Sequence, residues 1–254
     1  MVNRESLQRL VSIVREAGSL IQDRWAETRV GLKNDTSPVT DADCAAHAFI
    51  LMSLATWDPA IPVISEEGVL PPYETRRTWT RFWLIDPLDG TKEFLARRPE
   101  YTVNVALIED GEPVMGAVYA PALDLLYAAA RGLGAWKQEA SGARERIYSV
   151  PPRPDTPLVV AESRSHPSDA LEGFLKNFCI DRRVRAGSSI KFCWVAEGKA
   201  HLYPRFGPTM EWDTAAGDCV YRQSGSGGER WSPLKYNTPT LRHEQFVIGL
   251  PATT

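Results

Sequence analysis

Hydrophobic periodicity predicts two helices at the start of the chain, followed by a series of strands. Apolar residues recur every three or four positions from residue 3 to 25, opposite charged ones, as in an amphipathic helix. A second helix is expected over 43–55, with Thr40 or Asp41 as its N-cap. Short apolar or alternating runs between polar turns predict strands at 61–64, 81–85, 101–108, 114–120, 125–130 and 134–137.

The stretch 138–157 separates this half from the rest, because it holds a proline-rich segment at 151–154. Beyond it, strands are expected at 158–161, 200–204 and 246–250, and helices at 167–177, 188–197 and 213–222. The Gly- and Ser-rich residues 223–229 are expected to form a loop. We therefore predict an α/β protein with an N-terminal lobe of 1–150, a C-terminal lobe of 151–254 and a site between the two lobes.

The composition is that of a globular protein, with 43% hydrophobic and 24% charged residues. The 29 basic and 32 acidic residues leave a net charge of −3, which argues against a nucleic-acid partner and a polybasic membrane anchor. No apolar run approaches the ~18 residues of a membrane-spanning helix, so no transmembrane segment is expected. Acidic residues interrupt the N-terminus, which therefore does not resemble a signal peptide.

The cysteine pattern bears on the cellular compartment. Cys44, Cys179, Cys193 and Cys219 lie far apart and form no CxxC pair. This is typical of free, reduced thiols in a cytosolic protein. We expect a cytoplasmic protein, either free or peripheral at the inner membrane, and either a monomer or a homodimer.

The segment after the strand at 81–85 is the strongest candidate for chemistry. It places Asp86 and Asp89 on either side of Leu88, and Gly90 follows. Asp-Pro and Asp-Gly dipeptides are strong turn formers, so a plain turn is one interpretation. The other is that two carboxylates and a backbone carbonyl face one Mg²⁺ ion, which prefers oxygen ligands.

Further acids stand at the ends of other predicted elements. Glu66 follows a strand, Asp213 begins a helix, and Asp43 begins another. Taken separately, these acids are explained by a solvated loop and by helix caps. Gathered in one cleft they would repel each other unless cations were bound, which favours a metal site.

Four short motifs carry a resemblance to a known family. They are residues 39–43, 65–67, 83–91 and 212–217. In this order they resemble the signature motifs of the inositol monophosphatase superfamily, which implies an alternating α-β-α-β-α sandwich. Lys92 and the run 187–193 are more similar to the bacterial 3′(2′),5′-bisphosphate nucleotidase branch than to the inositol or fructose phosphatases.

The resemblance implies a metal ligand set and two to three Mg²⁺ ions per active site. Glu66, Asp86 and the carbonyl of Leu88 would bind a first ion. Asp86, Asp89 and Asp213 would bind a second, with Asp86 bridging. Two such cations can activate a water molecule and stabilise the leaving oxygen, so no protein nucleophile is required.

The resemblance also implies roles beside the metals. Thr91 and Asp43 match the pair that orients and deprotonates the attacking water. The backbone N–H groups of Gly90 and Thr91 would hold the scissile phosphate. Substrate contacts are also implied for the ligand residues Glu66, Leu88, Asp89 and Asp213.

A small-molecule nucleotide is the implied substrate, and four residues are candidates to bind it. Ser188 and Lys191 are three positions apart, so a helix would carry them on one face toward a second phosphate or the ribose. Arg205 is suited to grip a phosphate with two nitrogens. His166 matches a position that contacts substrate in eukaryotic relatives. An ordinary surface or capping role is the alternative for each.

The predicted function is Mg²⁺-dependent hydrolysis of the 3′-phosphate of adenosine 3′,5′-bisphosphate, giving AMP, with the sulfated analogue as a second substrate. An inositol or sugar phosphatase of the same superfamily is the first alternative. A non-catalytic nucleotide-binding protein is the second, and a missing metal ligand would favour it, but every matched position is intact. The resemblance further implies inhibition by Li⁺.

Overall fold

The computed structural model of the chain describes residues 2–26, 28–32, 38–140, 142–153, 156–164, 169–225 and 234–249. The helices in this part of the chain are α1 (Arg4–Arg24), α2 (Asp41–Trp57), α3 (Tyr73–Arg76), α4 (Thr91–Leu95), α5 (Asp169–Leu175), α6 (Ile190–Ala196) and α7 (Glu211–Gln223), with a 3₁₀ turn η1 (Pro121–Leu123). The large sheet has the order β3 (Val63–Ser65), β4 (Arg81–Asp89), β5 (Thr102–Glu109), β6 (Glu112–Ala120), β7 (Leu125–Ala130), β8 (Gly134–Gln138) and β9 (Arg144–Arg146). The small sheet has the order β11 (Ile180–Ala186), β10 (Leu158–Ser163), β12 (Leu202–Arg205) and β15 (Phe246–Gly249). Two short pairs join β1 (Val30–Leu32) to β2 (Pro38–Thr40) and β13 (Thr209–Met210) to β14 (Arg242–His243).

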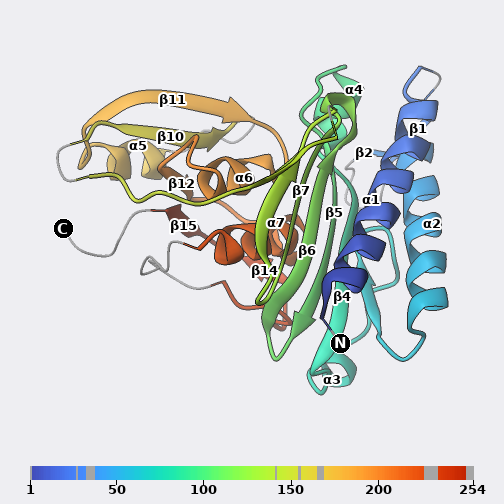
Figure 1. Cartoon of the computed structure of the whole chain (residues 1–254). Helices are drawn as coiled ribbons and strands as arrows, with labels where there is room; N and C mark the ends of the chain where they lie inside the picture. Colours follow the sequence, from blue (N-terminus) through green and yellow to red (C-terminus); the bar gives the residue numbers. More distant parts are fainter. Residues whose placement is uncertain are drawn as a thin grey trace.

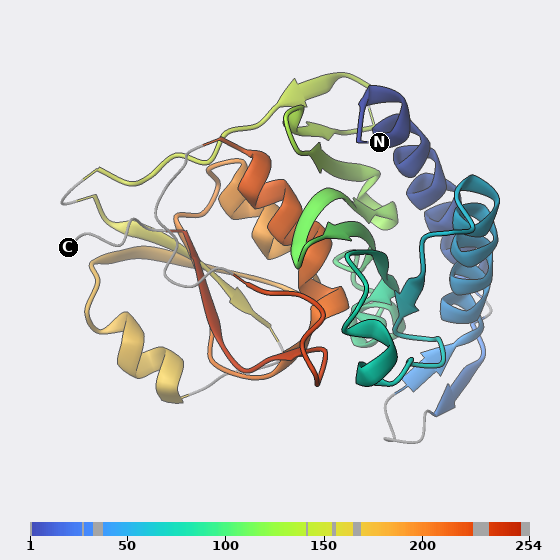
Figure 2. The same cartoon turned by 90° about the horizontal axis from the view of Figure 1, so that it is seen from below.

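These elements stack in layers, as Figures 1 and 2 show. Helices α1 and α2 cover one face of the large sheet, and α6 and α7 lie between the two sheets. Helix α5 packs on the small sheet through Leu171 and Leu175. The predicted α/β fold class, with alternating helical and sheet layers, is confirmed.

The first two helices form where the hydrophobic pattern predicts them. In α1, Leu10, Val14 and Ile21 are buried on one face, and the side chain of Asn3 caps the first turn. Helix α2 begins slightly earlier than predicted, because Thr40 is its N-cap and accepts a hydrogen bond from the backbone N–H of Asp43. The cap therefore fixes the position of Asp43.

The large sheet is mostly an antiparallel meander, and only β3 runs parallel to its neighbour β4. The strand predicted at 81–85 continues to Asp89 in β4. The pairing of β4 with β5 shifts register between Asp86 and Asp89. Such a bulge redirects side chains, so it changes where these two acids point relative to a regular strand.

The small sheet contains the main element that the sequence did not predict. Strand β11 pairs parallel with β10, but the segment carries Arg182, Arg183 and Arg185 and so lacks an apolar run. It lies at the edge of the sheet, where charged side chains are tolerated. Arg183 reaches Glu162 on β10 and Glu172 on α5, which balances part of this charge.

Other predictions differ in their limits. The helix predicted at 167–177 is α5, described from Asp169. The helix predicted at 188–197 is α6, which begins at Ile190. Helix α7 begins at Glu211, two residues before its predicted start. The pairs β1–β2 and β13–β14, the helix α3 and the strand β9 were not predicted, because such short elements leave little periodicity.

Helix α7 is held closely on both sides. A Cβ atom at Gly116 of β6 would lie 2.9 Å from the Cβ of Cys219, and one at Gly217 would lie 2.7 Å from the Cβ of Phe192 on α6. Real Cβ atoms essentially never approach this closely, so both glycines permit a close helix contact. The helix therefore packs tightly against the large sheet and against α6.

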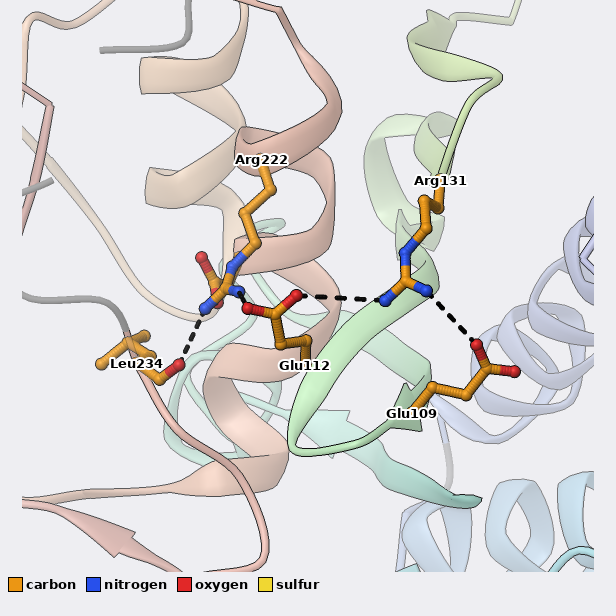
Figure 3. A network of polar contacts seen from close by, with 6 residues as sticks. Glu109, Glu112, Arg131, Arg222 and Leu234 are labelled. Carbon is orange, nitrogen blue, oxygen red and sulfur yellow. Dashed lines mark hydrogen bonds and ion pairs between the residues drawn. The ribbon is translucent and has the colours of Figure 1, made fainter. Parts of the chain in front are cut away.

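The C-terminal end of α7 is fixed by a network of charged side chains (Figure 3). Arg222 donates to Asp218 at 2.7 Å and lies 3.6 Å from Glu112 at the start of β6. Arg131 continues the chain of charges, 3.9 Å from Glu112 and 3.5 Å from Glu109. The network ties the helix to the β5–β6 hairpin.

The division into lobes of 1–150 and 151–254 stays a prediction. One hydrophobic core contains buried residues of both halves, such as Phe82 and Ile108 of the large sheet with Ala215 and Val220 of α7. Of the helices in the described ranges, none is long and apolar enough to cross a membrane.

Candidate active site

Three carboxylates meet between the large sheet and α7. Glu66 directly follows β3, Asp86 lies in β4 with 1% of its surface exposed, and Asp213 lies in the first turn of α7. One carboxylate oxygen from each residue lies within 4.8 Å of the others. Asp213, distant in sequence, is therefore close to Asp86, as the sequence predicts.

The local backbone explains how the first two acids come together. Because β3 runs parallel to β4, the backbone N–H of Glu66 donates to the carbonyl of Ile85 at 3.1 Å. The backbone N–H of Leu88 donates to Asp86 at 3.1 Å and holds that carboxylate. Gly90, at φ +94°, ends the segment in a left-handed conformation from which α4 begins.

Neutral hydrogen-bond donors orient Asp213 and the neighbouring Asp89. The hydroxyl of Thr209 and the backbone N–H of Met210 donate to one oxygen of Asp213, at 2.5 and 3.0 Å. The side-chain amide of Asn104 donates to Asp89 at 3.0 Å. Asp89 is not within the close group of three, but its charge acts on both Asp86 and Asp213.

Burial and mutual repulsion disfavour the charged forms of these acids. Burial raises the pKa of Asp86 well above its usual range, and the neighbouring carboxylates raise it further. Burial and the charge of Asp89 raise the pKa of Asp213 to about 7. Burial also raises the pKa of Asp89, although Lys191 and a hydrogen bond from Asn104 oppose this shift.

This donor set fits Mg²⁺. The group consists of carboxylate oxygens, with the backbone carbonyl of Leu88 nearby in the same segment, and magnesium prefers oxygen ligands. Cations would also relieve the repulsion that raises the pKa values. Glu66, Asp86 and Asp213 are the residues that could hold an ion, with Asp89 beside them.

The predicted water-activating pair is in contact. The hydroxyl of Thr91 lies 3.4 Å from both Asp43 and the carbonyl oxygen of Leu88. Asp43 is 2% exposed, and its other oxygen accepts hydrogen bonds from the backbone N–H and the hydroxyl of Thr40. The N-cap of α2 thus orients one oxygen of Asp43 toward Thr91.

A cleft of about 210 Å³ lies beside the acids. Both halves of the chain contribute to its wall, and the predicted site residues among its lining are Glu66, Asp89, Gly90, Thr91, Ser188, Lys191, Arg205 and Asp213. These eight of the predicted site residues therefore share one cavity, whereas Asp43, Asp86 and Leu88 are not part of its lining.

Lys191 is placed differently from what the sequence predicted. It is 2% exposed, and its ammonium group donates to the backbone carbonyls of Ala186, Gly187 and Ser188. Ser188 precedes α6 in a left-handed conformation, φ +47°, so the two residues do not share a helical face. That part of the prediction was wrong, because α6 starts later than the apolar pattern indicates.

The remaining predicted substrate contacts differ in accessibility. The guanidinium of Arg205 lines the cleft and donates to the backbone carbonyls of Gly207 at 3.3 Å and Pro208 at 2.9 Å. The hydroxyl of Ser188 is buried and has no hydrogen-bond partner in the described part of the chain. His166 lies outside the described residues.

Sequence reasoning missed several polar residues that support the site. His47 on α2 lies with its Nδ1 2.9 Å from the hydroxyl of Ser65, directly before Glu66. Asn104 on β5 reaches Asp89 and Ser189. For Asn104 the only signal in the sequence was a polar residue within an apolar strand. This signal is ambiguous, because a buried polar residue can also serve only to make hydrogen bonds that stabilise the fold.

A model described as the inositol monophosphatase family matches residues 3–238. The chain therefore belongs to this family, whose members are metal-dependent phosphatases, and the assignment made from the four motifs is confirmed.

Relatives with this family's fold are similar over nearly the whole chain. The 3′(2′),5′-bisphosphate nucleotidase CysQ of Salmonella typhimurium is 50% identical over 228 residues, covering 89% of this chain and 90% of its own. CysQ of Escherichia coli strain K12 is 48% identical over 235 residues, covering 91% and 93%. The crystal structure of CysQ from Bacteroides thetaiotaomicron has a TM-score of 0.84 at 36% identity, over 98% of both chains.

Proposed function

We propose that the chain hydrolyses the 3′-phosphate of adenosine 3′,5′-bisphosphate to give AMP and phosphate, with Mg²⁺ as its cofactor. The observation that carries the proposal is the close group of Glu66, Asp86 and Asp213 beside a cleft that also holds Arg205. The name of the relatives, 3′(2′),5′-bisphosphate nucleotidase, supports the choice of substrate.

The chemistry divides between the cations and the protein. Bound Mg²⁺ ions supply charge for the phosphoryl oxygens and the leaving oxygen, and they make a water molecule more acidic. Thr91 orients the attacking water, and Asp43 takes up its proton through the Thr91 hydroxyl, with which it is in contact. The backbone N–H groups of Gly90 and Thr91 hold the scissile phosphate.

The wall opposite the acids would recognise the rest of the substrate. Arg205 offers a positive charge to the 5′-phosphate, which is anchored there and not cleaved. Ser188 offers a hydroxyl whose hydrogen-bonding capacity is not used by the described residues. Lys191 would contribute charge and would hold the loop that carries Ser188. The sulfated analogue would react if the cleft accepts the extra group.

Phosphate release from a panel of substrates tests the proposal. The panel contains adenosine 3′,5′-bisphosphate, its sulfated analogue, inositol 1-phosphate and fructose 1,6-bisphosphate, each with Mg²⁺ and with EDTA. We expect the highest kcat/KM for the bisphosphate nucleotide and no turnover in EDTA. Faster hydrolysis of inositol 1-phosphate or fructose 1,6-bisphosphate would contradict the substrate and leave the phosphatase chemistry standing.

The metal count and the assembly are part of the same proposal. Two to three Mg²⁺ ions per active site are expected, and calorimetric titration of the metal-free protein would count them. A monomer or a homodimer is expected, and light scattering would distinguish the two.

A further inference from the structure

Asn104 is a buried polar residue in the middle of β5. It is 0% exposed, and in the sheet it is paired with Asp86 of β4 and Val118 of β6. Most of β5 is apolar, so an amide here has a cost unless its hydrogen bonds are made. The contacts of its side chain therefore indicate why it is present.

Both hydrogen atoms of the Asn104 amide nitrogen have acceptors. The nitrogen lies 3.0 Å from an oxygen of Asp89 and 3.0 Å from the hydroxyl oxygen of Ser189, just before α6. The Ser189 hydroxyl in turn donates to the backbone carbonyl of Asp213. A continuous chain of hydrogen bonds thus connects Asp89, at the end of β4, with Asp213, in the first turn of α7.

The orientation of the amide follows from this chain. The Ser189 hydroxyl uses its proton on Asp213, so it presents a lone pair to Asn104. Asp89 as a carboxylate is also an acceptor, so only the nitrogen side of the amide suits both neighbours. The amide oxygen of Asn104 is left buried without a hydrogen-bond partner among the described residues. This arrangement serves the two acceptors at the expense of the amide oxygen.

We infer that Asn104 is a positioning residue for the metal site. It holds one oxygen of Asp89, so that this carboxylate would be oriented for a cation, and through Ser189, which donates to the backbone carbonyl of Asp213, it fixes the first turn of α7. Carboxylate ligands are commonly held by such hydrogen bonds, and losing one typically costs about 10–100-fold in metal affinity or activity. The inference rests on the metal site of the proposed function and not on the identity of its substrate.

Asn104→Leu tests the inference, because leucine has a similar volume and no N–H group. Thr102→Val is the matched control: Thr102 is on the same strand, is also 0% exposed, and its hydroxyl has no hydrogen-bond partner in the described ranges. The readout is the rise in melting temperature of the metal-free protein as Mg²⁺ is added, which needs no substrate. We expect the Mg²⁺ concentration at half-maximal rise to increase by about 10–100-fold in Asn104→Leu and to stay unchanged in Thr102→Val.

Activity measurements separate positioning from a purely structural role. In Asn104→Leu the Mg²⁺ concentration for half-maximal rate should increase by the same factor, while KM for the nucleotide at saturating Mg²⁺ stays the same. Wild-type Mg²⁺ dependence of the melting temperature would overturn the inference, whatever the activity. If Asn104→Leu does not fold, Ser189→Ala is the test variant, because it removes only the hydrogen bonds that Ser189 makes with Asn104 and Asp213. Unchanged Mg²⁺ affinity in Ser189→Ala would also overturn the inference. If the proposed substrate were wrong, the effect of Asn104→Leu on the Mg²⁺ dependence of the melting temperature would still be seen. Failure of the substrate assignment can therefore be distinguished from failure of this inference.

Discussion

The two ends of α7 hold a carboxylate in opposite ways. At the C-terminal end, Asp218 is 1% exposed and accepts hydrogen bonds from Arg222 at 2.7 Å and from Tyr236 at 3.0 Å. At the N-terminal end, Asp213 accepts from the neutral donors Thr209 and Met210. An arginine neutralises the charge within the protein, whereas neutral donors only orient it. This difference fits a stabilising role for Asp218 and is consistent with the metal site proposed above for Asp213.

Removing a charge from the acidic group beside the N-terminal end of α7 should have the largest effect. Asp89→Asn is expected to lower kcat by about 10³-fold or more, because a metal ion supplies several kcal/mol of transition-state stabilisation. The fold should remain, since the change relieves repulsion among buried acids. Steady-state kinetics and circular dichroism measure both, and a variant with wild-type rates would contradict the two-metal assignment.

The same change at the C-terminal end should affect stability and not chemistry. Asp218→Asn removes the carboxylate 2.7 Å from Arg222 and leaves Glu112, at 3.6 Å, as its remaining acidic partner, so the loss should reach at most the roughly 3–5 kcal/mol that breaking a buried ion pair costs. We expect the free energy of unfolding in urea to fall by up to this amount, with kcat unchanged while the protein is folded. A loss of kcat as large as that of Asp89→Asn would remove the contrast between the two ends.

The contrast also predicts a pH-dependent effect of Mg²⁺. Without metal, Asp213 has its pKa raised from 3.8 to about 7, so between these pH values the folded chain keeps a proton that the unfolded chain has lost. Unfolding then releases a proton, and stability falls as the pH rises through this range. Mg²⁺ at 100 times its Kd should restore about 2.7 kcal/mol. At a fixed concentration it should stabilise the protein more at pH 7 than at pH 4, because protons compete with the ion for the carboxylates.

Melting curves in EDTA and in Mg²⁺ across this range measure that effect. Asp213→Asn is the control, because it has no carboxyl to titrate, and its melting temperature in EDTA should show a weaker fall with pH. Equal slopes in the two proteins would mean that Asp213 is not the group responsible.

Arg205 in the cleft and Arg222 at the C-terminal end of α7 should also differ in their roles. Arg205→Ala is expected to raise KM for adenosine 3′,5′-bisphosphate by about 10–100-fold, because a hydrogen bond to a charged group contributes about 1.5–3 kcal/mol. A small monophosphate that does not reach Arg205 should be hydrolysed as before. Equal losses on both substrates would show that Arg205 serves the fold, as Arg222 does.

Lithium should give the smallest effect. As a small monovalent cation, Li⁺ is expected to compete with Mg²⁺ at the site formed by Asp86, Asp89 and Asp213. It should therefore lower the rate of hydrolysis and leave the melting temperature of the protein nearly unchanged. Rates measured with and without millimolar Li⁺ test this, and an unaffected rate would count against competition there.

Most of the helical and sheet layers could be predicted from the sequence, and the four acidic segments could be singled out as candidates for chemistry. Both depend on local patterns of residues. The spacing of apolar residues in α1 and the acids Asp86 and Asp89 near the end of β4 are visible without any tertiary information. The edge strand β11 was missed, because its arginines are stabilised by Glu162 and Glu172, which only the fold brings near. Its exposed side chains leave no alternating pattern to detect.

Contacts between side chains were harder to predict than the elements that carry them. The prediction for Lys191 followed from its type and position, yet its ammonium group lies against three backbone carbonyls of the preceding loop. The contacts of Asn104 could not be predicted from its strand, because the residues that it joins come from β4 and from the segment just before α6. Such links require the register of the sheet and the packing of two helices to be known together.

The close fit of α7 bears on how a ligand enters and leaves. The helix carries Asp213 and packs against Gly116 of β6 on one side and, through its own Gly217, against Phe192 of α6 on the other. Its residues Ala216 and Cys219 are buried. A wide hinge opening of the cleft would have to separate α7 from one of these neighbours and expose that apolar surface to water. Exchange of substrate and product is therefore expected to depend on small movements of loops at the entrance of the cleft, while α7 stays in place.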